Sequence, residues 1–295
     1  MLFLNKKGKK YKIILSMFKK EWCKVKVYNR EVKDLLTKSK LPDADYVINP
    51  YIGCTHNCIY CYAEFMSRFA HCSEKWGNYI IVKDSIKGIK CKDMEQKTIL
   101  ISSVTDPYNH IERKYRKTRS VLEQLIDSEA TIEILTKSKN VLDDIELIKK
   151  IKNIKIGISI NTTDDKFREK IEPCASSVDE RINTLKVLHE NNIKTYAFIS
   201  PIFPEITDCR EIIDKVKNYV DYICFENLNL RGNYKKVVLD FIKINYPDLI
   251  DLYNNIYLKK NLSYWEDYKK DLNNYLESLE LDYRYYFYHD KIKKK

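Results

Sequence analysis

The 295-residue sequence predicts an α/β protein built around a partial, open (β/α)6 barrel of the TIM type. From residue 45 onward, short apolar segments rich in β-branched residues alternate with segments of helical period. Strands that alternate with helices in this way form βαβ units and a parallel sheet. Six such units fall short of the eight of a complete barrel, so we expect the barrel to stay open.

The expected elements follow one another in a regular order. The helices lie between the strands and are predicted at 64–70, 115–127, 141–151, 178–190 and 208–219. The strands are predicted at 46–52, 98–104, 131–136, 154–160, 194–200 and 221–226. Ligands of parallel α/β sheets bind at the carboxyl ends of the strands, so the residues directly after each strand are the candidates for chemistry.

Two extensions flank the predicted barrel, which spans residues 45–232. The N-terminal extension, 1–44, is basic: the first 40 residues hold thirteen Lys or Arg against three acidic residues. Such an arm could neutralise phosphates, or it could be a solvated extension without a partner. The C-terminal extension, 233–295, is expected to be helical and is rich in tyrosine.

The composition indicates a cytoplasmic protein without a membrane segment. Apolar residues make up 44% of the chain and charged residues 32%, and no apolar run approaches the ~18 residues that cross a bilayer. The N-terminus lacks the apolar core and cleavage site of a signal peptide.

Nine cysteines are too few for a disulfide scaffold in a chain of this length, and three of them lie within eight residues. Clustered cysteines in a reducing compartment indicate a metal site.

That cluster comprises Cys54, Cys58 and Cys61, with the spacing Cys-x3-Cys-x2-Cys. Iron–sulfur clusters are held by thiolates, and three cysteines on one loop can cap three corners of a [4Fe–4S] cube while the fourth iron stays open. Two other interpretations remain at this point. A structural zinc site would need a fourth ligand, such as His56, or the cysteines could be reduced and bind no metal.

The motif and its surroundings resemble the radical S-adenosylmethionine (SAM) superfamily, and within it the spore photoproduct lyase-like family, also labelled DNA repair photolyases. The resemblance covers roughly residues 45–230. It is carried by 49–63 (NPYIGCTHNCIYCYA), 105–108 (TDPY), 112–115 (ERKY), 118–119 (TR), 135–138 (LTKS), 159–163 (SINTT), 172–173 (EP) and 200–208 (SPIFPEITD).

This resemblance implies a [4Fe–4S] cluster and SAM as cofactors, with a one-electron reductant of the flavodoxin or ferredoxin type as partner. Reductive cleavage of SAM would give a 5′-deoxyadenosyl radical that abstracts hydrogen from a substrate, and the cofactor rather than the protein supplies that chemistry. The substrate itself is not identified by the sequence.

The resemblance also implies roles in SAM binding at the strand ends. The backbone of Tyr60 would meet the adenine, although Tyr60 could equally pack in the core. Thr105 and Asp106 would receive the amino group of SAM, because an ammonium donor pairs strongly with a carboxylate. Asp106 precedes a proline, however, and Asp-Pro is also a common turn opener.

Four further residues complete the implied site. Ser159 and Asn161, on one face of the fourth strand, would contact the ribose, and Glu172 would add to that contact. Arg181 could reach the carboxylate of SAM as a guanidinium fork, or it could be an ordinary surface charge on its helix.

One departure from the family argues against the reaction of spore photoproduct lyase itself. Spore photoproduct lyase donates hydrogen from a cysteine at the end of its second strand, where this chain has Ser102-Ser103-Val104. Cys72, Cys91 and Cys174 remain as possible donors. The family, the basic arm and the tyrosine-rich tail together point to a nucleic-acid substrate, although the tyrosines could instead simply pack helices. A radical SAM enzyme acting on a peptide or protein, and a metal-bearing nucleic-acid-binding protein without turnover, are the alternatives.

Overall fold

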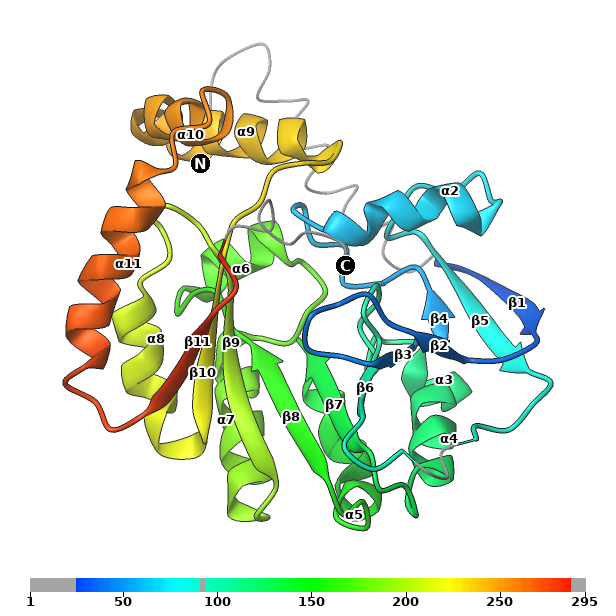
Figure 1. Ribbon diagram of the computed structural model, residues 1–295. Coiled ribbons are helices and arrows are strands. Elements are labelled where there is room, and N and C mark those ends of the chain that lie inside the picture. Colours follow the sequence, from blue (N-terminus) through cyan, green and yellow to red (C-terminus); the bar gives the residue numbers. More distant parts are fainter. Residues whose placement is uncertain (1–24, 91–93, 288–295) are drawn as a thin grey trace.

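A computed structural model describes residues 25–90 and 94–287 and has an eight-stranded sheet at its centre (Figure 1). The strand order in this sheet is β11-β10-β9-β8-β7-β6-β3-β2, and the edge strand β2 (Leu36–Lys38) is antiparallel to β3. The first and last strands of that order are edges, so the sheet is curved and open. The predicted fold class, a partial TIM-like barrel, is confirmed.

The six expected strands lie side by side in sequence order, and each is parallel to its neighbour. They are β3 (Tyr46–Ile48), β6 (Thr98–Ile101), β7 (Thr131–Thr136), β8 (Ile154–Ser159), β9 (Lys194–Ile202) and β10 (Tyr222–Asn227). Their carboxyl ends therefore meet at one edge of the sheet, as the alternation of strands and helices predicts.

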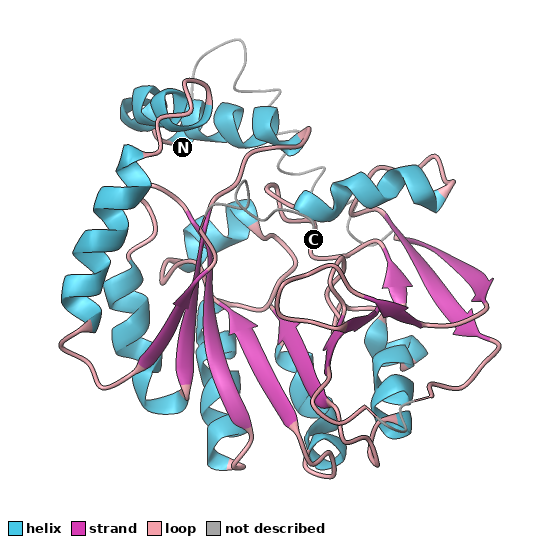
Figure 2. Cartoon of the chain, in the orientation of Figure 1, coloured by secondary structure: helices cyan, strands magenta, loops and turns pink. Residues whose placement is uncertain are grey.

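Helices cover the convex face of this sheet and bury the apolar side of each strand (Figure 2). The covering helices are α4 (Lys117–Gln124), α5 (Ile145–Ile148), α7 (Val178–Glu190), α8 (Cys209–Val216) and α11 (Ser263–Leu276). Ile156, Ile158 and Ile160, which alternate along β8, all lie in this core. The opposite, concave face carries the polar and aromatic side chains of the strands.

On the concave face, the ring of Tyr196 lies against Gly157 and is stacked on Tyr222, with ring centroids 4.9 Å apart. The Tyr196 hydroxyl donates a hydrogen bond of 2.7 Å to Glu133, which also pairs with Lys155 at 2.7 Å. The barrel interior below the strand ends is thus filled by side chains, as in complete barrels.

A second, three-stranded sheet was not predicted. Its order is β1 (Lys26–Val32), β5 (Tyr79–Ser85), β4 (Tyr51–Ile52). The expected strand 46–52 is in fact two strands, β3 and β4, which belong to different sheets and are separated at Pro50. Strand β1 lies within the segment expected to be only a basic extension. The division of the chain at residues 44 and 232 remains a prediction.

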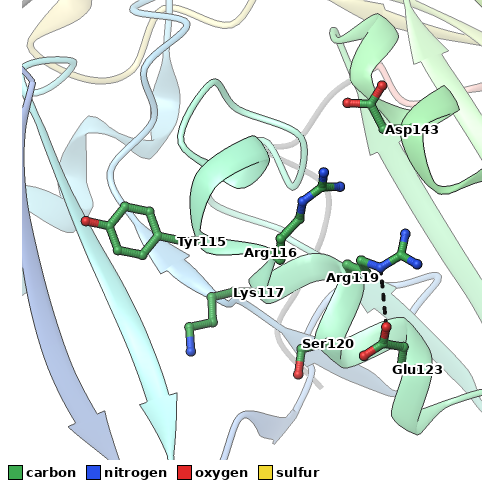
Figure 3. A pocket seen from close by; sticks show the side chains of 7 residues that line it. All are labelled: Tyr115, Arg116, Lys117, Arg119, Ser120, Glu123 and Asp143. Carbon is green, nitrogen blue, oxygen red and sulfur yellow. Dashed lines mark ion pairs between the residues drawn. The ribbon is translucent and has the colours of Figure 1, made fainter.

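Several expected helices are shorter or interrupted. Segment 115–127 is divided into α3 (Glu112–Tyr115) and α4, because Arg116 has a left-handed backbone with φ of 52°. The backbone N–H groups that begin α4 are capped by the buried Glu112 carboxylate, which accepts from Thr118 and Arg119. The basic hollow beside α4 contains charges that are already paired, such as Arg119 with Glu123 (Figure 3).

Segment 141–151 is likewise divided, into the 3-10 turn η2 (Lys139–Asp144) and α5, and 208–219 into α8 and η3 (Lys217–Tyr219). The helix expected at 64–70 is η1 (Tyr62–Met66) followed by α2 (Ser67–Ala70). One helix that was not predicted, α6 (Asp165–Ile171), follows β8.

The C-terminal segment is helical as expected over α9 (Tyr234–Asn245), η4 (Pro247–Leu249), α10 (Ile250–Tyr257) and α11. It then returns as β11 (Asp282–Tyr285), which pairs parallel with β10 and was expected to be helix. The aromatic rings of this segment pack largely against one another and the core, as Trp265 does against Phe287. Across the described residues, no helix has the length and apolar character needed to span a bilayer.

The contact between Gly157 and Tyr196 gives a test of the concave packing. A Cβ at position 157 would lie 2.2 Å from the Tyr196 ring, so Gly157→Ala must displace a ring held by its stack and its hydrogen bond. We expect a loss of about 1–3 kcal/mol in the free energy of unfolding, measured by urea denaturation. Gly88→Ala is the matched control, because its nearest neighbour would lie 3.5 Å away. Equal stability of both variants would contradict this packing.

Candidate active site

The three motif cysteines lie on one loop that leaves β4 at the carboxyl edge of the main sheet. Gly53 begins this loop with φ of +96°, and a Cβ there would lie 2.4 Å from the Tyr79 carbonyl oxygen. The loop is attached to the last residue of α6, because Ile59 N donates to Ile171 O at 3.0 Å. Its end turns directly into η1, with Cys61 N donating to Cys58 O.

The thiol of Cys61 lies close enough to Cys54 and to Cys58 to raise the pKa of both. Burial raises the pKa of Cys54 to about 12, with contributions from Asp106 and Cys61, and burial raises the pKa of Cys58 well above its ordinary value. Over the described ranges, no three His, Cys, Asp or Glu side chains are already arranged with metal-binding geometry. Three sulfur ligands on one short loop, with Cys54 buried and Cys58 and Cys61 half-buried, nevertheless suit an iron–sulfur cluster.

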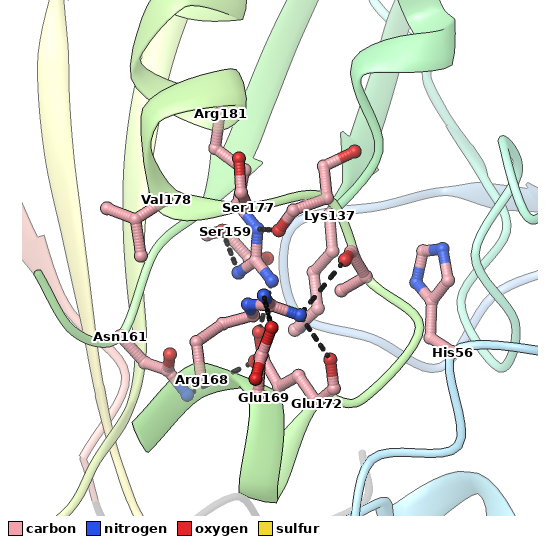
Figure 4. Close-up of polar contacts among 12 residues, drawn as sticks. His56, Lys137, Ser159, Asn161, Arg168, Glu169, Glu172, Ser177, Val178 and Arg181 are labelled. Atoms are coloured by element: carbon pink, nitrogen blue, oxygen red, sulfur yellow. Dashed lines mark hydrogen bonds and ion pairs between the residues drawn. The ribbon is translucent and has the colours of Figure 1, made fainter. Parts of the chain in front are cut away.

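A buried ion pair lies beside this loop and joins residues that the sequence singled out (Figure 4). Arg181 and Glu172 are both fully buried, and the guanidinium donates from Nη2 to the Glu172 carboxylate. Arg181 also donates to the carbonyl oxygens of Ser159, at 3.0 Å, and Ser176, at 2.9 Å. Its interpretation as a surface helix charge is therefore wrong.

The other oxygen of Glu172 faces the cysteine loop. Glu172 Oε1 accepts hydrogen bonds from the Tyr60 hydroxyl and from Asn161 Nδ2, the latter at 3.1 Å. Burial opposes ionisation of Glu172, but Arg181 and Lys137 outweigh it and hold its pKa below the ordinary value. The Oδ1 atom of Asn161 is buried and has no partner, which is unusual for a buried polar atom and leaves an acceptor for a ligand.

Asp106 and Thr105 serve the turn that follows β6. Asp106 accepts from Thr136 Oγ1 at 2.6 Å, from Lys137 N at 2.7 Å and from Tyr108 N at 2.9 Å. Through these bonds Asp106 stabilises the turn after β6, which is the role that an Asp-Pro sequence predicts. The Thr105 hydroxyl donates to the Gly53 carbonyl at 2.5 Å and so attaches this turn to the cysteine loop.

Two further residues lie at the site: Lys137, which the sequence did not single out, and His56, which it offered only as a fourth ligand of a zinc site. Lys137 directly follows β7, and its Nζ lies 5.9 Å from the centre of the Tyr60 ring, where Glu172 and Cys58 favour its charged form. His56 Nδ1 lies 3.4 Å from Asp106 Oδ2, and burial lowers the pKa of His56 to about 4. The position of Lys137 at a strand end was a signal that could have identified it.

The residues considered as hydrogen-atom donors, and the serines that replace the lyase cysteine, make fewer contacts than the residues of the buried network. Ser102 and Ser103 follow β6, at the place of the lyase cysteine, and the buried Ser102 hydroxyl has no partner. The Ser103 carbonyl accepts a hydrogen bond from Tyr62, whose side chain is 59% exposed. Cys72 and Cys174 are half-buried, and Cys91 lies outside the described residues.

Comparison with known proteins identifies the family. The model of the radical SAM superfamily matches residues 48–216, more than half of the chain. The chain belongs to the radical SAM superfamily, which implies a [4Fe–4S] cluster and SAM. A protein of Methanocaldococcus jannaschii is 40% identical over 233 residues, 79% of this chain and 88% of the relative.

Solved structures agree with this fold. Spore photoproduct lyase, in a structure complexed with dinucleoside spore photoproduct, has a TM-score of 0.65 at 17% identity, over 88% of this chain and 82% of the lyase chain. Streptococcus suis SuiB bound to its precursor peptide SuiA has a TM-score of 0.50 at 15% identity, over 96% of this chain and 55% of SuiB. At these identities the similarity concerns the fold.

The buried ion pair leads to a stability prediction. Glu172→Gln leaves the Arg181 guanidinium buried without a counter-charge, and we expect a loss of about 3–5 kcal/mol in the free energy of unfolding at neutral pH. Because the pKa of Glu172 is lowered in the folded state, its stabilisation is present above about pH 4.3 and disappears as the pH falls through the folded value. The difference between wild type and variant should therefore shrink in acid.

Glu169→Gln is the control, since Glu169 is exposed on the same short segment and its pairing with Arg168 is weak at 3.6 Å. We expect it to change the free energy of unfolding by less than about 0.5 kcal/mol. A Glu172→Gln variant as stable as this control, or a difference that does not depend on pH, would show that the ion pair is not formed as described.

Proposed function

We propose that this protein is a radical SAM enzyme that acts on a nucleic-acid substrate. It would hold a [4Fe–4S] cluster on Cys54, Cys58 and Cys61 and bind SAM at the carboxyl edge of the sheet. The observation that carries the proposal is the buried network of Tyr60, Asn161 and Glu172 beside the cysteine loop, with an unpaired acceptor left on Asn161.

The cysteine loop supports the cluster in two ways. Its three thiolates would cap three irons, and the loop offers no fourth cysteine, so one iron is left for a ligand. Its backbone is fixed on one side by the turn after β6 and on the other by the segment after α6. When bound, the cluster and SAM supply a 5′-deoxyadenosyl radical by one-electron reduction, with the electron coming from a flavodoxin- or ferredoxin-type protein.

The strand ends would orient SAM. Asn161 Oδ1 is proposed to accept a hydrogen bond from a ribose hydroxyl, with Ser159 contributing from the end of β8. Glu172, which accepts from Asn161 Nδ2, would hold the amide in that orientation. The Tyr60 backbone is proposed to face the adenine, while its hydroxyl is held by Glu172. Thr105 and Asp106 are proposed to shape the pocket for the amino group through the turn that they stabilise.

The cation for the SAM carboxylate is proposed to be Lys137 rather than Arg181. Arg181 is fully buried and uses its donors on Glu172 and two carbonyl groups, so its position fits a structural role. Lys137 Nζ lies over the Tyr60 ring, and no carboxylate of the described chain is within ion-pair distance of it. A flexible ammonium group beside the cluster loop can reach a carboxylate ligand.

A nucleic-acid substrate is supported by the basic N-terminal residues and by the fold shared with spore photoproduct lyase, which was solved with a dinucleoside. The serine at the place of the lyase cysteine argues for a different reaction on that substrate, because a hydroxyl O–H bond is too strong to donate hydrogen to a carbon radical. SuiB, solved with a peptide, keeps a peptide substrate as the competing candidate.

The cluster assignment is tested by anaerobic reconstitution. We expect about four irons per chain and formation of 5′-deoxyadenosine on reduction with dithionite in the presence of SAM. Cys58→Ala should take up much less iron and form no 5′-deoxyadenosine, whereas Cys72→Ala, outside the motif, should behave as wild type. Normal iron content and SAM cleavage in Cys58→Ala would refute the assignment of the ligands.

The role of Lys137 is tested by SAM affinity. Lys137→Met removes a charge-assisted hydrogen bond, so the Kd for SAM, measured by anaerobic calorimetry, should rise about 10- to 100-fold. Lys139→Met is the matched control, because Lys139 lies two residues away and pairs with the exposed Glu180. If both variants bind SAM with wild-type affinity, Lys137 does not contact the cofactor.

A further inference from the structure

An exposed aromatic patch lies on the helical segment that follows the cysteine loop. The patch consists of Phe65, Arg68 and Phe69, and the two phenylalanine side chains are 44% and 48% exposed. The Arg68 guanidinium carbon lies 5.3 Å from the Phe65 ring centre and 4.9 Å from that of Phe69. Two large aromatic rings left in water beside a cation are a feature of interaction sites rather than of ordinary surface.

The patch is held rigidly close to the candidate active site. Element η1, which carries Phe65, begins at the residue after Cys61, and α2 continues it over the three-stranded sheet (Figure 1). Arg30 of β1 donates to the carbonyl oxygens of Phe69, at 3.1 Å, and Ala70, at 2.6 Å, which end α2. The rings are therefore presented on a fixed support that is continuous with the cysteine loop.

The sequence that precedes this support is rich in lysine. Strand β1, which fixes the patch, is preceded by residues 1–24, and their sequence contains eight lysines and one glutamate. The first residues of β1 are attached beside α2, because Lys26 and Tyr28 both contact Glu74, four residues after α2 ends. The lysine-rich sequence thus leads into the strand whose Arg30 fixes the aromatic patch. This combination is complementary to a polyanion that also has flat apolar surfaces.

We propose that the patch is a platform for a single-stranded nucleic acid, on which unpaired bases stack against Phe65 and Phe69. Arg68 would contact a phosphate, and the strand would run from the platform toward the cysteine loop. Exposed aromatic rings combined with basic side chains are how proteins bind single strands, since every base has a face that stacks. Paired bases in a duplex hide these faces. The inference rests on the proposed function and specifies its substrate as an unpaired strand.

The test uses full-length protein and a fluorescein-labelled dT12 oligonucleotide, with binding followed by fluorescence anisotropy. Phe65→Ala/Phe69→Ala should weaken binding at least about 5-fold for each stacked base that is lost. The dependence of its affinity on salt should stay close to that of wild type. Arg68→Gln should instead reduce the slope of log K against log salt by about one, because one phosphate contact is removed.

Two further measurements separate stacking from other contacts. Phe65→Leu/Phe69→Leu keeps most of the apolar area but not the rings, so it should bind dT12 nearly as weakly as the alanine variant. Val237→Ala, at an exposed apolar position on α9, is the control and should bind as wild type. An abasic oligonucleotide of equal length should bind wild type as weakly as dT12 binds the alanine variant.

Three results would overturn the proposed platform: wild-type affinity of the double alanine variant for dT12, equal binding of dT12 and its abasic analogue, or tighter binding of a duplex than of dT12.

The competing interpretation is that the patch is a docking surface for the reductant protein. In that case the alanine variant would keep dT12 binding and dithionite-driven SAM cleavage but lose cleavage driven by flavodoxin. Failure of the proposed function is separate, because wild type would then form no 5′-deoxyadenosine with dithionite, whatever its affinity for dT12.

Discussion

The buried ion pair between Glu172 and Arg181 is the constraint on which the site depends. Two fully buried charges can be kept only if each is satisfied, and here the partners come from several elements. Arg181 on α7 fixes the end of β8 through the Ser159 carbonyl, while Glu172 after α6 holds Tyr60 of the cysteine loop and Asn161. One carboxylate thereby aligns the loop with the strand end where a cofactor would lie.

The cysteine loop connects this network with the outer surface. On its inner side it is attached to the strand ends, and on its outer side it continues into η1 and α2, which carry the aromatic patch. A substrate held on that patch would therefore be positioned by the same short segment that positions the thiolates. Placing two functions on one rigid segment keeps the distance between them fixed, which hydrogen abstraction by a short-lived radical requires.

Much of the fold could be predicted from the sequence because it is encoded locally. The alternating isoleucines of β8 and the period of α7 identify these elements without tertiary information, and the elements were found within a residue of their expected bounds. The cysteine motif is also local, and it indicated the family that the superfamily match confirms.

The features that the sequence could not show depend on residues that are distant along the chain. Strand β1 exists through its pairing with β5, and β11 through β10. The division between α3 and α4 follows from the left-handed backbone of Arg116. The burial of Arg181 depends on Glu172, so its helix position alone suggested a surface charge equally well.

Mössbauer spectroscopy of protein reconstituted with 57Fe can show whether three thiolates hold a cluster whose remaining iron binds SAM. We expect a [4Fe–4S] spectrum in which about one iron in four changes its isomer shift and quadrupole splitting when SAM is added, because that iron alone lacks a protein thiolate. A spectrum with four equivalent irons that SAM does not alter would contradict it. So would a protein that takes up a single zinc ion with four side-chain ligands in place of iron.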